Sequence, residues 1–474
     1  MLKVSTAASW RTPARRVLRE VVREALGSCN ARQAVLRNVG VGARRLNLCG
    51  RSLTLERKGR LLILAYGKAA GPMTEGLLDR VLEAGATRRV EGLVIGPGSL
   101  KPGRPAGGLR LTCLRGEHPV PGRGAFAAGR AALRLAAAAR AGDDVVFLAS
   151  GGGSSMMAAP LAPFLTRADK AQLHRALIGS GAPVEAINAV RKRFSALKGG
   201  RLAIAARRAS SLTTLIVCDV DPERCDEVAS GPSLPDRSTF DDMVLAIDRH
   251  GLAPLLPERA LEAMRSGRLP DTPRAGIAAF RRARWEVVVS NRDLRAAAVR
   301  AGLSRGLPSE AVGTEMAGPV GDAVERLGRA VETAPSGTRL LVLGGEVTTV
   351  PVGRGRGGRA QEFALRLALR LSGLAVRPWT FLALGSDGID GNSPAAGAIV
   401  DGASLDRARA SRLDPRRQLG QSNSYGFFRR LGDEVLTGPT GTNVRDLYLL
   451  LTGEVRGIGA GGPGRLLTPT GPDR

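Results

Sequence analysis

Short apolar segments that end in glycine-rich loops recur along this chain, and segments with helical periodicity follow them. The first apolar segment covers residues 61–66 and ends at Gly67. Others cover residues 90–95, 145–149 and 211–217. An apolar run of this length is typical of a strand that is buried on both faces. Because such strands alternate with helices, the sequence predicts an α/β fold with a parallel, Rossmann-like sheet.

The chain is long enough for more than one domain, since its 474 residues exceed the usual size of a single core. Residues 251–285 are rich in Pro, Arg and Gly and have weak periodicity, which is typical of a connection. We therefore predict an N-terminal Rossmann-like domain at residues 1–270 and a smaller α/β domain at residues 285–455. The Gly/Pro-rich tail, residues 456–474, is predicted to be disordered.

The formal net charge of +27 could indicate a polyanion partner. The basic residues are nearly all Arg and are spread along the whole chain, and aromatic residues make up only 3%. These features favour a compositional bias, so we expect no specific nucleic-acid partner. The five cysteines are scattered, and no apolar run is long enough to span a bilayer. We expect a cytoplasmic protein with no membrane partner.

Three consecutive glycines follow the predicted strand at 145–149, in the loop Ser150–Ser155. Without Cβ atoms, backbone N–H groups can approach an anion closely, and a helix that starts there would add a favourable dipole. The alternative is a tight turn with a serine cap. More glycines are present than a cap requires, which favours a phosphate site. Its predicted residues are Gly151, Gly152, Gly153, Ser154 and Ser155.

Charged residues occupy three further positions next to predicted strands or helices. Lys68 follows the strand at 61–66, where it could neutralise a phosphate, or its ammonium could instead reach solvent. Asp387 and Asp390 lie in a glycine-rich loop, where they could share Mg²⁺ or form an Asx turn. Arg359 lies near the start of a predicted helix and could clamp a transferring phosphoryl group.

Several of these segments follow one another in a characteristic order. They are residues 67–70, 117–121, 150–155, 188–200, 229–232, 345–350, 357–362, 385–391 and 437–444. In series they resemble the glycerate 2-kinase family. The segments up to residue 232 resemble its N-terminal domain, and the later ones resemble its C-terminal domain, which is named MOFRL.

The resemblance implies an ATP-dependent kinase that converts D-glycerate to 2-phosphoglycerate with Mg²⁺, in a cleft between two domains. Lys68 and Arg359 would then be the catalytic residues. The ATP phosphates would lie on residues 151–155, with Asn443 beside them. Glycerate would be bound by Arg191, Ser195, Lys198 and Glu346. The metal would be held by Asp219 or Asp387.

The chain departs from the usual pattern of this family at three places. Ala360 replaces an asparagine, which removes a possible donor to the ligand. Glu117 replaces the glycine of a Gly-His-Pro motif, and Asp221-Pro222-Glu223 alters a turn after Asp219. Two alternatives therefore stay open. One is an oxidoreductase of the hydroxypyruvate reductase type, although no G-x-G-x-x-G fingerprint follows the first strand. The other is a non-catalytic relative that binds anions or nucleic acid. The oligomeric state is open too, with a homodimer among the alternatives.

Overall fold

The computed structural model describes residues 9–56, 58–98, 109–313 and 315–455, and the chain divides into two compact units. The larger unit comprises Cys29–Ser290 and Gly441–Val444. The smaller unit comprises Met1–Ser28, Asn291–Thr440 and Arg445–Arg474. The tail predicted to be disordered, residues 456–474, lies outside the described residues.

A parallel sheet of six strands forms the centre of the larger unit, in the order β6-β5-β4-β7-β8-β9. The strands are β4 (Leu61–Tyr66), β5 (Val90–Gly96), β6 (Leu109–Arg115), β7 (Asp144–Ser150), β8 (Ser211–Val217) and β9 (Ala283–Val289). Every residue of β4, β7 and β8 is buried, as the apolar runs indicate. The predicted parallel, Rossmann-like sheet is therefore confirmed.

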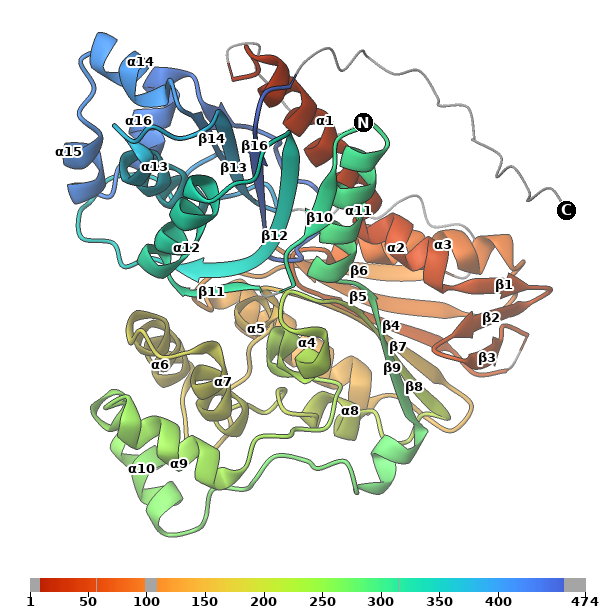
Figure 1. Cartoon of the computed structure of the whole chain (residues 1–474). Coiled ribbons are helices and arrows are strands. Elements are labelled where there is room, and N and C mark those ends of the chain that lie inside the picture. Colours follow the sequence, from red (N-terminus) through yellow and green to blue (C-terminus); the bar gives the residue numbers. More distant parts are fainter. Residues whose placement is uncertain (1–8, 57, 99–108, 314, 456–474) are drawn as a thin grey trace, which may run out of the picture. The chain divides into compact units, whose positions relative to one another are not determined.

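Helices cover both faces of this sheet (Figure 1). On one face lie α2 (Ala31–Asn38) and α3 (Ala70–Glu83), and on the other lie α4 (Arg123–Ala137) and α8 (Arg201–Ala205). A separate helical cluster has its own apolar core. It contains α6 (Arg167–Gly179), α7 (Val184–Arg193), α9 (Phe240–Arg249) and α10 (Glu258–Arg265). A small antiparallel sheet is formed by β1 (Gly40–Gly42), β2 (Arg45–Leu48) and β3 (Arg51–Thr54).

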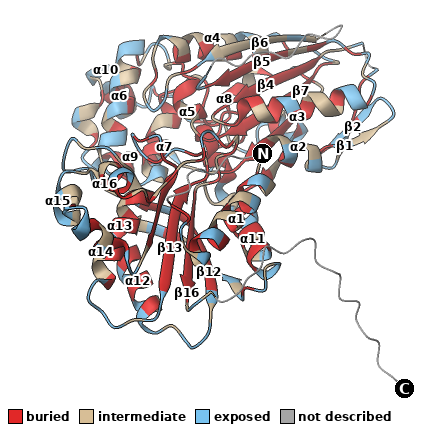
Figure 2. Cartoon of the chain, turned by 90° about the horizontal axis from the view of Figure 1, so that it is seen from above, coloured by how far each residue is buried: buried red, intermediate tan, exposed pale blue. Residues whose placement is uncertain are grey.

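The smaller unit is built on a mixed sheet in the order β10-β12-β16-β13-β14-β15, with β11 paired to β12. The strands are β10 (Ser309–Ala311), β11 (Met316–Pro319), β12 (Arg339–Thr348), β13 (Trp379–Gly385), β14 (Gly397–Asp401), β15 (Glu434–Val435) and β16 (Asp446–Thr452). The helices are α1 (Pro13–Ser28), α11 (Asn291–Leu303), α12 (Val320–Glu332), α13 (Arg359–Leu371), α14 (Ser404–Ala410), α15 (Pro415–Gly420) and α16 (Ser424–Leu431). Figure 2 shows β13 and β16 buried along their length, like β4 and β7 in the larger unit.

The units do not follow the ranges expected from the sequence. Helix α1 packs on α11 and therefore belongs to the smaller unit. Strand β9, which the sequence suggests as the start of a second domain, pairs with β8 and completes the first sheet. Among the described residues, no helix is long and apolar enough to cross a membrane.

Candidate active site

The glycine-rich loop connects β7 to α5 (Gly153–Met156) in the larger unit. A Cβ atom at Gly151 would lie 1.8 Å from Asp219 Oδ2, and one at Gly153 would lie 2.9 Å from the Cβ of Ala229. Gly152 has a φ of 80°, which L side chains rarely adopt. The loop therefore needs its glycines. The helix that was expected to add a favourable dipole, α5, has only four residues and the chain becomes extended at Met157, so its dipole is small.

Lys68 lies directly against this loop, because β4 and β7 are neighbouring parallel strands. Its backbone N–H donates to Gly151 O (2.8 Å), and its Cγ lies 3.2 Å from where a Cβ of Gly152 would be. Asp219 follows the next strand, β8, and its Oδ2 accepts a hydrogen bond from Asn443 Nδ2 (3.3 Å). Lys68, the glycines, Asp219 and Asn443 thus meet at the carboxyl edge of the sheet, where α/β folds bind their ligands.

The two serines of the loop have partners within the larger unit. Ser154 Oγ lies 2.9 Å from Ser230 Oγ, and Ser155 Oγ lies 2.7 Å from His118 Nδ1. Ser230 is itself in a left-handed conformation with a φ of 60°. Such a conformation costs a non-glycine residue on the order of 1 kcal/mol, and it persists only where the surroundings hold it. These contacts fix the shape of the loop.

Lys198 and Ser195, both predicted to bind substrate, make backbone contacts instead. Lys198 is fully buried, and its Nζ donates to Ser154 O (2.7 Å) and to Met157 O (3.3 Å). Ser195 is also fully buried, and its hydroxyl donates to Ala159 O (3.3 Å). The ammonium of Lys198 therefore supports the carbonyl groups of α5 from beneath the glycine-rich loop.

Three basic side chains gather around Lys198 and form with it what we call the buried cation cluster: Lys170, His174 and Arg191. Burial, with a smaller effect of the Arg191 charge, lowers the pKa of Lys198 to about 7. Burial also lowers the pKa of Arg191 to about 10. Burial and then the neighbouring cations lower the pKa of Lys170 and of His174. Every neighbouring charge that shifts these pKa values is positive.

Two polar atoms of this cluster are buried without a hydrogen-bond partner in the described part of the chain, Arg191 Nε and His174 Nδ1. Burial and mutual repulsion oppose the protonated forms of the two lysines and the histidine, and an unsatisfied buried polar atom adds a further free-energy cost. A bound anion would favour the protonated forms and could accept a hydrogen bond from Arg191 Nε. The cluster therefore has the chemistry of an anion site, and Arg191, predicted from the sequence, is part of it.

In the smaller unit, Arg359 and Glu346, which the resemblance assigns to catalysis and to glycerate binding, form an ion pair. Arg359 is the first residue of α13, and its Nε donates to Asp446 Oδ2 (2.6 Å) while Nη2 donates to Asp446 Oδ1 (3.0 Å). Its Nη1 donates to Glu346 Oε1. Burial alone would lower the pKa of Arg359, but these two carboxylates raise it well above its ordinary value. The guanidinium is therefore permanently charged and held in one orientation.

Asp446 and Tyr448 belong to this site although the sequence did not indicate them. Tyr448 is buried, and its hydroxyl donates to Asp446 Oδ2 (3.0 Å). Both residues lie inside strand β16 rather than in a loop. Asp446 is the first residue of the strand, so its place directly before the apolar run 447–451 is the signal that could have pointed to it.

The suggestion that Asp387 and Asp390 share a metal is wrong. Asp390 is buried and accepts hydrogen bonds from the N–H groups of Ala360 (3.1 Å) and Gln361 (2.9 Å), so it caps helix α13. The Oδ1 of Asp387 accepts from the N–H of Ile389 (3.0 Å), as in an Asx turn. No group of three or more His, Cys, Asp or Glu residues is placed to hold a metal in the described ranges.

Asp390 leads to a prediction about stability and pH. Burial raises its pKa to about 6 in the folded chain, whereas an unfolded Asp titrates near 4. Between about pH 4 and pH 6 the folded state keeps a proton that the unfolded state releases, so this group makes the free energy of unfolding fall as pH rises. We expect Asp390→Asn to remove about 2–3 kcal/mol of that decline, measured by urea unfolding across this range. Parallel curves for the two proteins would contradict the assignment.

Comparison with known proteins places the chain in a family. The family described as "domain of unknown function (DUF4147)" matches residues 17–265, and the MOFRL family matches residues 339–446. A protein of Agrobacterium vitis named as a hydroxypyruvate reductase is 34% identical over 93% of this chain and 95% of its own length. The glycerate 2-kinase of Pyrococcus horikoshii is 29% identical over 92% of this chain and 97% of its own length.

A solved structure agrees with these matches. The glycerate kinase of Thermotoga maritima has a TM-score of 0.73 to this chain at 28% identity, and the match covers 92% of this chain and 99% of that structure. The first matched family covers five of the six strands of the sheet that carries Lys68 and the glycine-rich loop, and the second covers the segment that carries Arg359 and Asp387. The chain therefore belongs to the glycerate 2-kinase family with a C-terminal MOFRL domain.

Proposed function

We propose that this chain is an ATP-dependent kinase that phosphorylates D-glycerate to 2-phosphoglycerate. The observation that carries the proposal is the buried cation cluster, which lies under the glycine-rich loop through the contact of Lys198 Nζ with Ser154 O. Within the described residues no carboxylate forms an ion pair with a side chain of this cluster, and the carboxylate of glycerate would supply the missing negative charge. Arg191, whose Nε is buried without a partner, is the residue we propose to bind that carboxylate.

An enzyme catalyses phosphoryl transfer mainly by positioning the reactants and stabilising the charge of the transition state, and little by covalent chemistry of its own. We propose that the glycine-rich loop holds the phosphates and that the ammonium of Lys68, whose aliphatic chain packs beside Gly152, offsets the charge on the phosphoryl oxygens. Arg359 is proposed as the second cation of the transfer, held in orientation by Asp446 and Glu346. These roles agree with the names of the relatives, which include a glycerate 2-kinase.

Mg²⁺ is a further part of the proposal. Mg²⁺ in kinases takes one or two carboxylates together with phosphate oxygens and water, so it needs no dedicated cage of protein ligands. Asp219 fits this requirement, because its carboxylate lies beside Gly151 and next to the amide of Asn443. Asp387 stays a second candidate for the metal ligand. Held by either carboxylate, Mg²⁺ would neutralise charge on the phosphate oxygens.

We also propose the cytoplasm, where ATP is available, as the compartment of the protein. None of its five cysteines, all within the described residues, is in a disulfide, which agrees with a reducing compartment.

The direct test supplies ATP, Mg²⁺ and D-glycerate and follows the product with enolase. Enolase acts on 2-phosphoglycerate directly, whereas 3-phosphoglycerate needs a mutase first, so the assay with and without mutase identifies the phosphorylated carbon. A second arm follows NADH or NADPH with hydroxypyruvate. ATP-dependent product that appears without mutase supports the proposal. Turnover in the NAD(P)H arm alone would overturn it in favour of a reductase.

The buried cation cluster gives a separate prediction for acceptor binding. We expect Arg191→Met to raise KM for D-glycerate by roughly 10- to 100-fold, because a charge-assisted contact to the carboxylate is lost. KM for ATP should stay close to that of the wild type. The free energy of unfolding should stay the same or rise, since a buried unpaired cation opposes folding.

The matched control is Arg175→Met, an exposed arginine on α6, the helix that carries Lys170 and His174. It should leave KM for glycerate unchanged. Thermal denaturation with and without D-glycerate gives a readout that does not depend on turnover: the ligand should raise the Tm of the wild type and of Arg175→Met but not of Arg191→Met. A glycerate shift that survives Arg191→Met would contradict the assignment.

A further inference from the structure

The segment that connects β6 to α4 packs on α5, the short helix of the glycine-rich loop. A Cβ atom at Gly116 would lie 2.2 Å from Met156 O, so the backbone of this segment is in direct contact with α5. Two residues later, His118 Nδ1 lies 2.7 Å from Ser155 Oγ. The connecting segment therefore contacts two successive residues of α5.

Helix α5 depends on such contacts for its shape. It has only four residues, and a helix this short is not stable by itself. Lys198 holds it through two of the nearby carbonyl groups. Ser155 is 2% exposed, and its hydroxyl donates to Gly152 O (3.1 Å) and lies against His118. The position of Ser155 thus depends on where the segment at His118 is held.

Glu117, the residue before His118, fixes this segment to the start of α4. Its Oε2 accepts from the N–H groups of Gly122 (3.2 Å) and Ala125 (2.7 Å), and its Oε1 accepts from the N–H of Gly124 (2.9 Å). Gly122 is the N-cap residue of α4 and has no side chain that could accept these bonds. One carboxylate therefore satisfies three N–H groups and closes residues 117–125 into a ring.

The carboxylate of Glu117 is charged and closely packed. Burial alone would raise its pKa, but hydrogen bonds from backbone N–H groups, chiefly those of Ala125 and Gly124, lower the pKa below its ordinary value. A Cβ at Gly122 would lie 2.7 Å from Glu117 Cδ, and a Cβ at Gly124 would lie 3.0 Å from Oε1. The two glycines thus leave the room that the carboxylate occupies, and at neutral pH the cap carries its full charge.

We propose that Glu117 is a positioning residue for the nucleotide phosphates: it fixes the segment through which His118 holds Ser155, and so keeps the glycine-rich loop in its phosphate-binding shape. This inference rests on the proposed function, because it takes the loop as the phosphate site. Glu117 replaces the glycine of the family's Gly-His-Pro motif, so the cap is not part of the family's usual pattern.

A positioning role makes a specific change in the kinetic constants. If removal of the carboxylate leaves only about a tenth of the molecules with the loop in its binding shape, the apparent Kd for the nucleotide rises about tenfold. Bound nucleotide returns the loop to this shape, so turnover at saturation changes little. KM for ATP therefore rises while kcat stays nearly the same, whereas loss of a catalytic group lowers kcat.

Titration calorimetry with Mg²⁺ and adenylyl imidodiphosphate, a non-hydrolysable ATP analogue, tests the inference. We expect Glu117→Ala to bind the analogue about tenfold more weakly than the wild type, and to raise KM for ATP by a similar factor with kcat within about threefold. Glu117→Gln keeps an acceptor oxygen at the same place, so it should recover part of the lost affinity. If Glu117→Ala bound the analogue as tightly as the wild type, the inference would be wrong.

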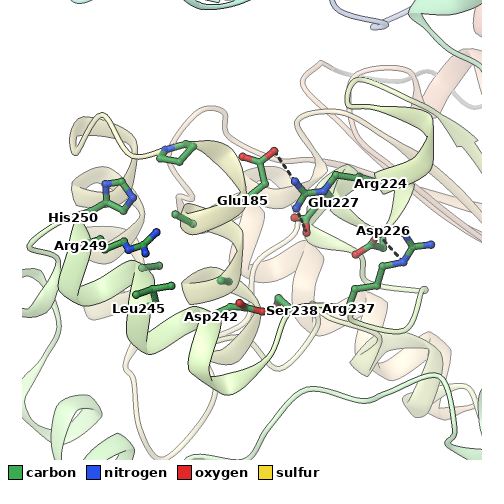
Figure 3. A pocket seen from close by; sticks show the side chains of 14 residues that line it. Glu185, Arg224, Asp226, Glu227, Arg237, Ser238, Asp242, Leu245, Arg249 and His250 are labelled. Atoms are coloured by element: carbon green, nitrogen blue, oxygen red, sulfur yellow. Dashed lines mark hydrogen bonds and ion pairs between the residues drawn. The ribbon is translucent and has the colours of Figure 1, made fainter.

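The matched control is Asp242→Ala, which removes another carboxylate that caps a helix of the larger unit. Asp242 Oδ2 accepts from the N–H of Thr239 at the start of α9 (2.6 Å). Asp242 lines a cavity of the helical cluster (Figure 3), and the described residues of that lining include none from the glycine-rich loop. Both variants should lower the Tm by about 2–4 °C, but only Glu117→Ala should weaken the analogue. Equal weakening in both would indicate a general loss of stability and overturn the positioning role.

A double-mutant cycle tests whether Glu117 acts through His118. His118→Ala removes the contact with Ser155 and leaves the cap in place, and it should weaken the analogue about as much as Glu117→Ala does. In the double variant we expect no further loss beyond about twofold, because both changes remove the same support. Additive losses, about a hundredfold in the double variant, would contradict an action through His118.

The binding measurements also separate this inference from the proposed function. A wild type that binds the analogue but does not phosphorylate D-glycerate would overturn the proposed acceptor and leave the role of Glu117 standing. A wild type that does not bind the analogue would overturn both.

Discussion

Replacing Lys68 with alanine is expected to lower kcat/KM for ATP and D-glycerate by about 10³-fold. The ammonium is carried on a loop fixed to the glycine-rich loop by the bond from the Lys68 N–H to Gly151 O, and the Lys68 Cγ lies 3.2 Å from where a Cβ of Gly152 would be. Removing the charge leaves this backbone bond in place. The expected loss is therefore in the transfer of the phosphoryl group, measured by the enolase-coupled assay.

The control for this variant is Lys58→Ala, an exposed lysine in the same unit, which should keep full activity. In Lys68→Ala the glycerate-induced rise in Tm should persist, because the buried cation cluster is intact. An activity loss below about tenfold, with Tm and glycerate binding unchanged, would remove Lys68 from the catalytic residues.

The second large effect is expected for Gly151→Ala. The added Cβ would lie 1.8 Å from Asp219 Oδ2 and 2.2 Å from Asn443 Nδ2, so the hydrogen bond between these two side chains must break or the loop must move. We expect a loss of about 10²-fold in kcat/KM and about 1–3 kcal/mol in the free energy of unfolding, measured by the coupled assay and by urea denaturation. The metal dependence should weaken as well, since Asp219 is displaced.

Gly179→Ala provides the matched control in the same unit. Gly179 ends α6, and a Cβ there meets nothing within 4 Å. Its stability and activity should stay within about 0.5 kcal/mol and about twofold of the wild type. If Gly151→Ala behaved like this control, the loop would be far more adaptable than its contacts indicate, and Asp219 would lose its support as a metal ligand.

The parallel sheet of the larger unit could be predicted because each central strand is a continuous apolar run ending in glycine. Strand β6 could not, because its residues alternate between half-buried and exposed and no such run appears. The antiparallel pairing of strands in the smaller unit could not be predicted either. A short apolar run is compatible with both a parallel and an antiparallel sheet. Strand β9 was assigned to the wrong unit for a related reason, because the sequence of a strand does not indicate which strand it pairs with.

The candidate site also has a part that the sequence could predict and a part that it could not. Lys68 and the glycines directly follow predicted strands, and the carboxyl ends of parallel strands lie at the same edge of a sheet, so their proximity could be predicted. The buried cation cluster takes its members from α6, α7 and the segment after α7, which only tertiary packing brings together. Asp390 was misread because a carboxylate that caps a helix 30 residues earlier in the chain looks, in sequence, like a loop acid that is available for a metal.

The position of α1 has a consequence for synthesis of the chain. Its apolar face, with Leu18, Val21 and Val22 fully buried, packs on α11, which begins only at Asn291. At translation rates of about 5–20 residues per second, α1 would leave the ribosome roughly ten to fifty seconds before its partner exists. During that time its apolar face is a natural site for a chaperone that binds nascent chains.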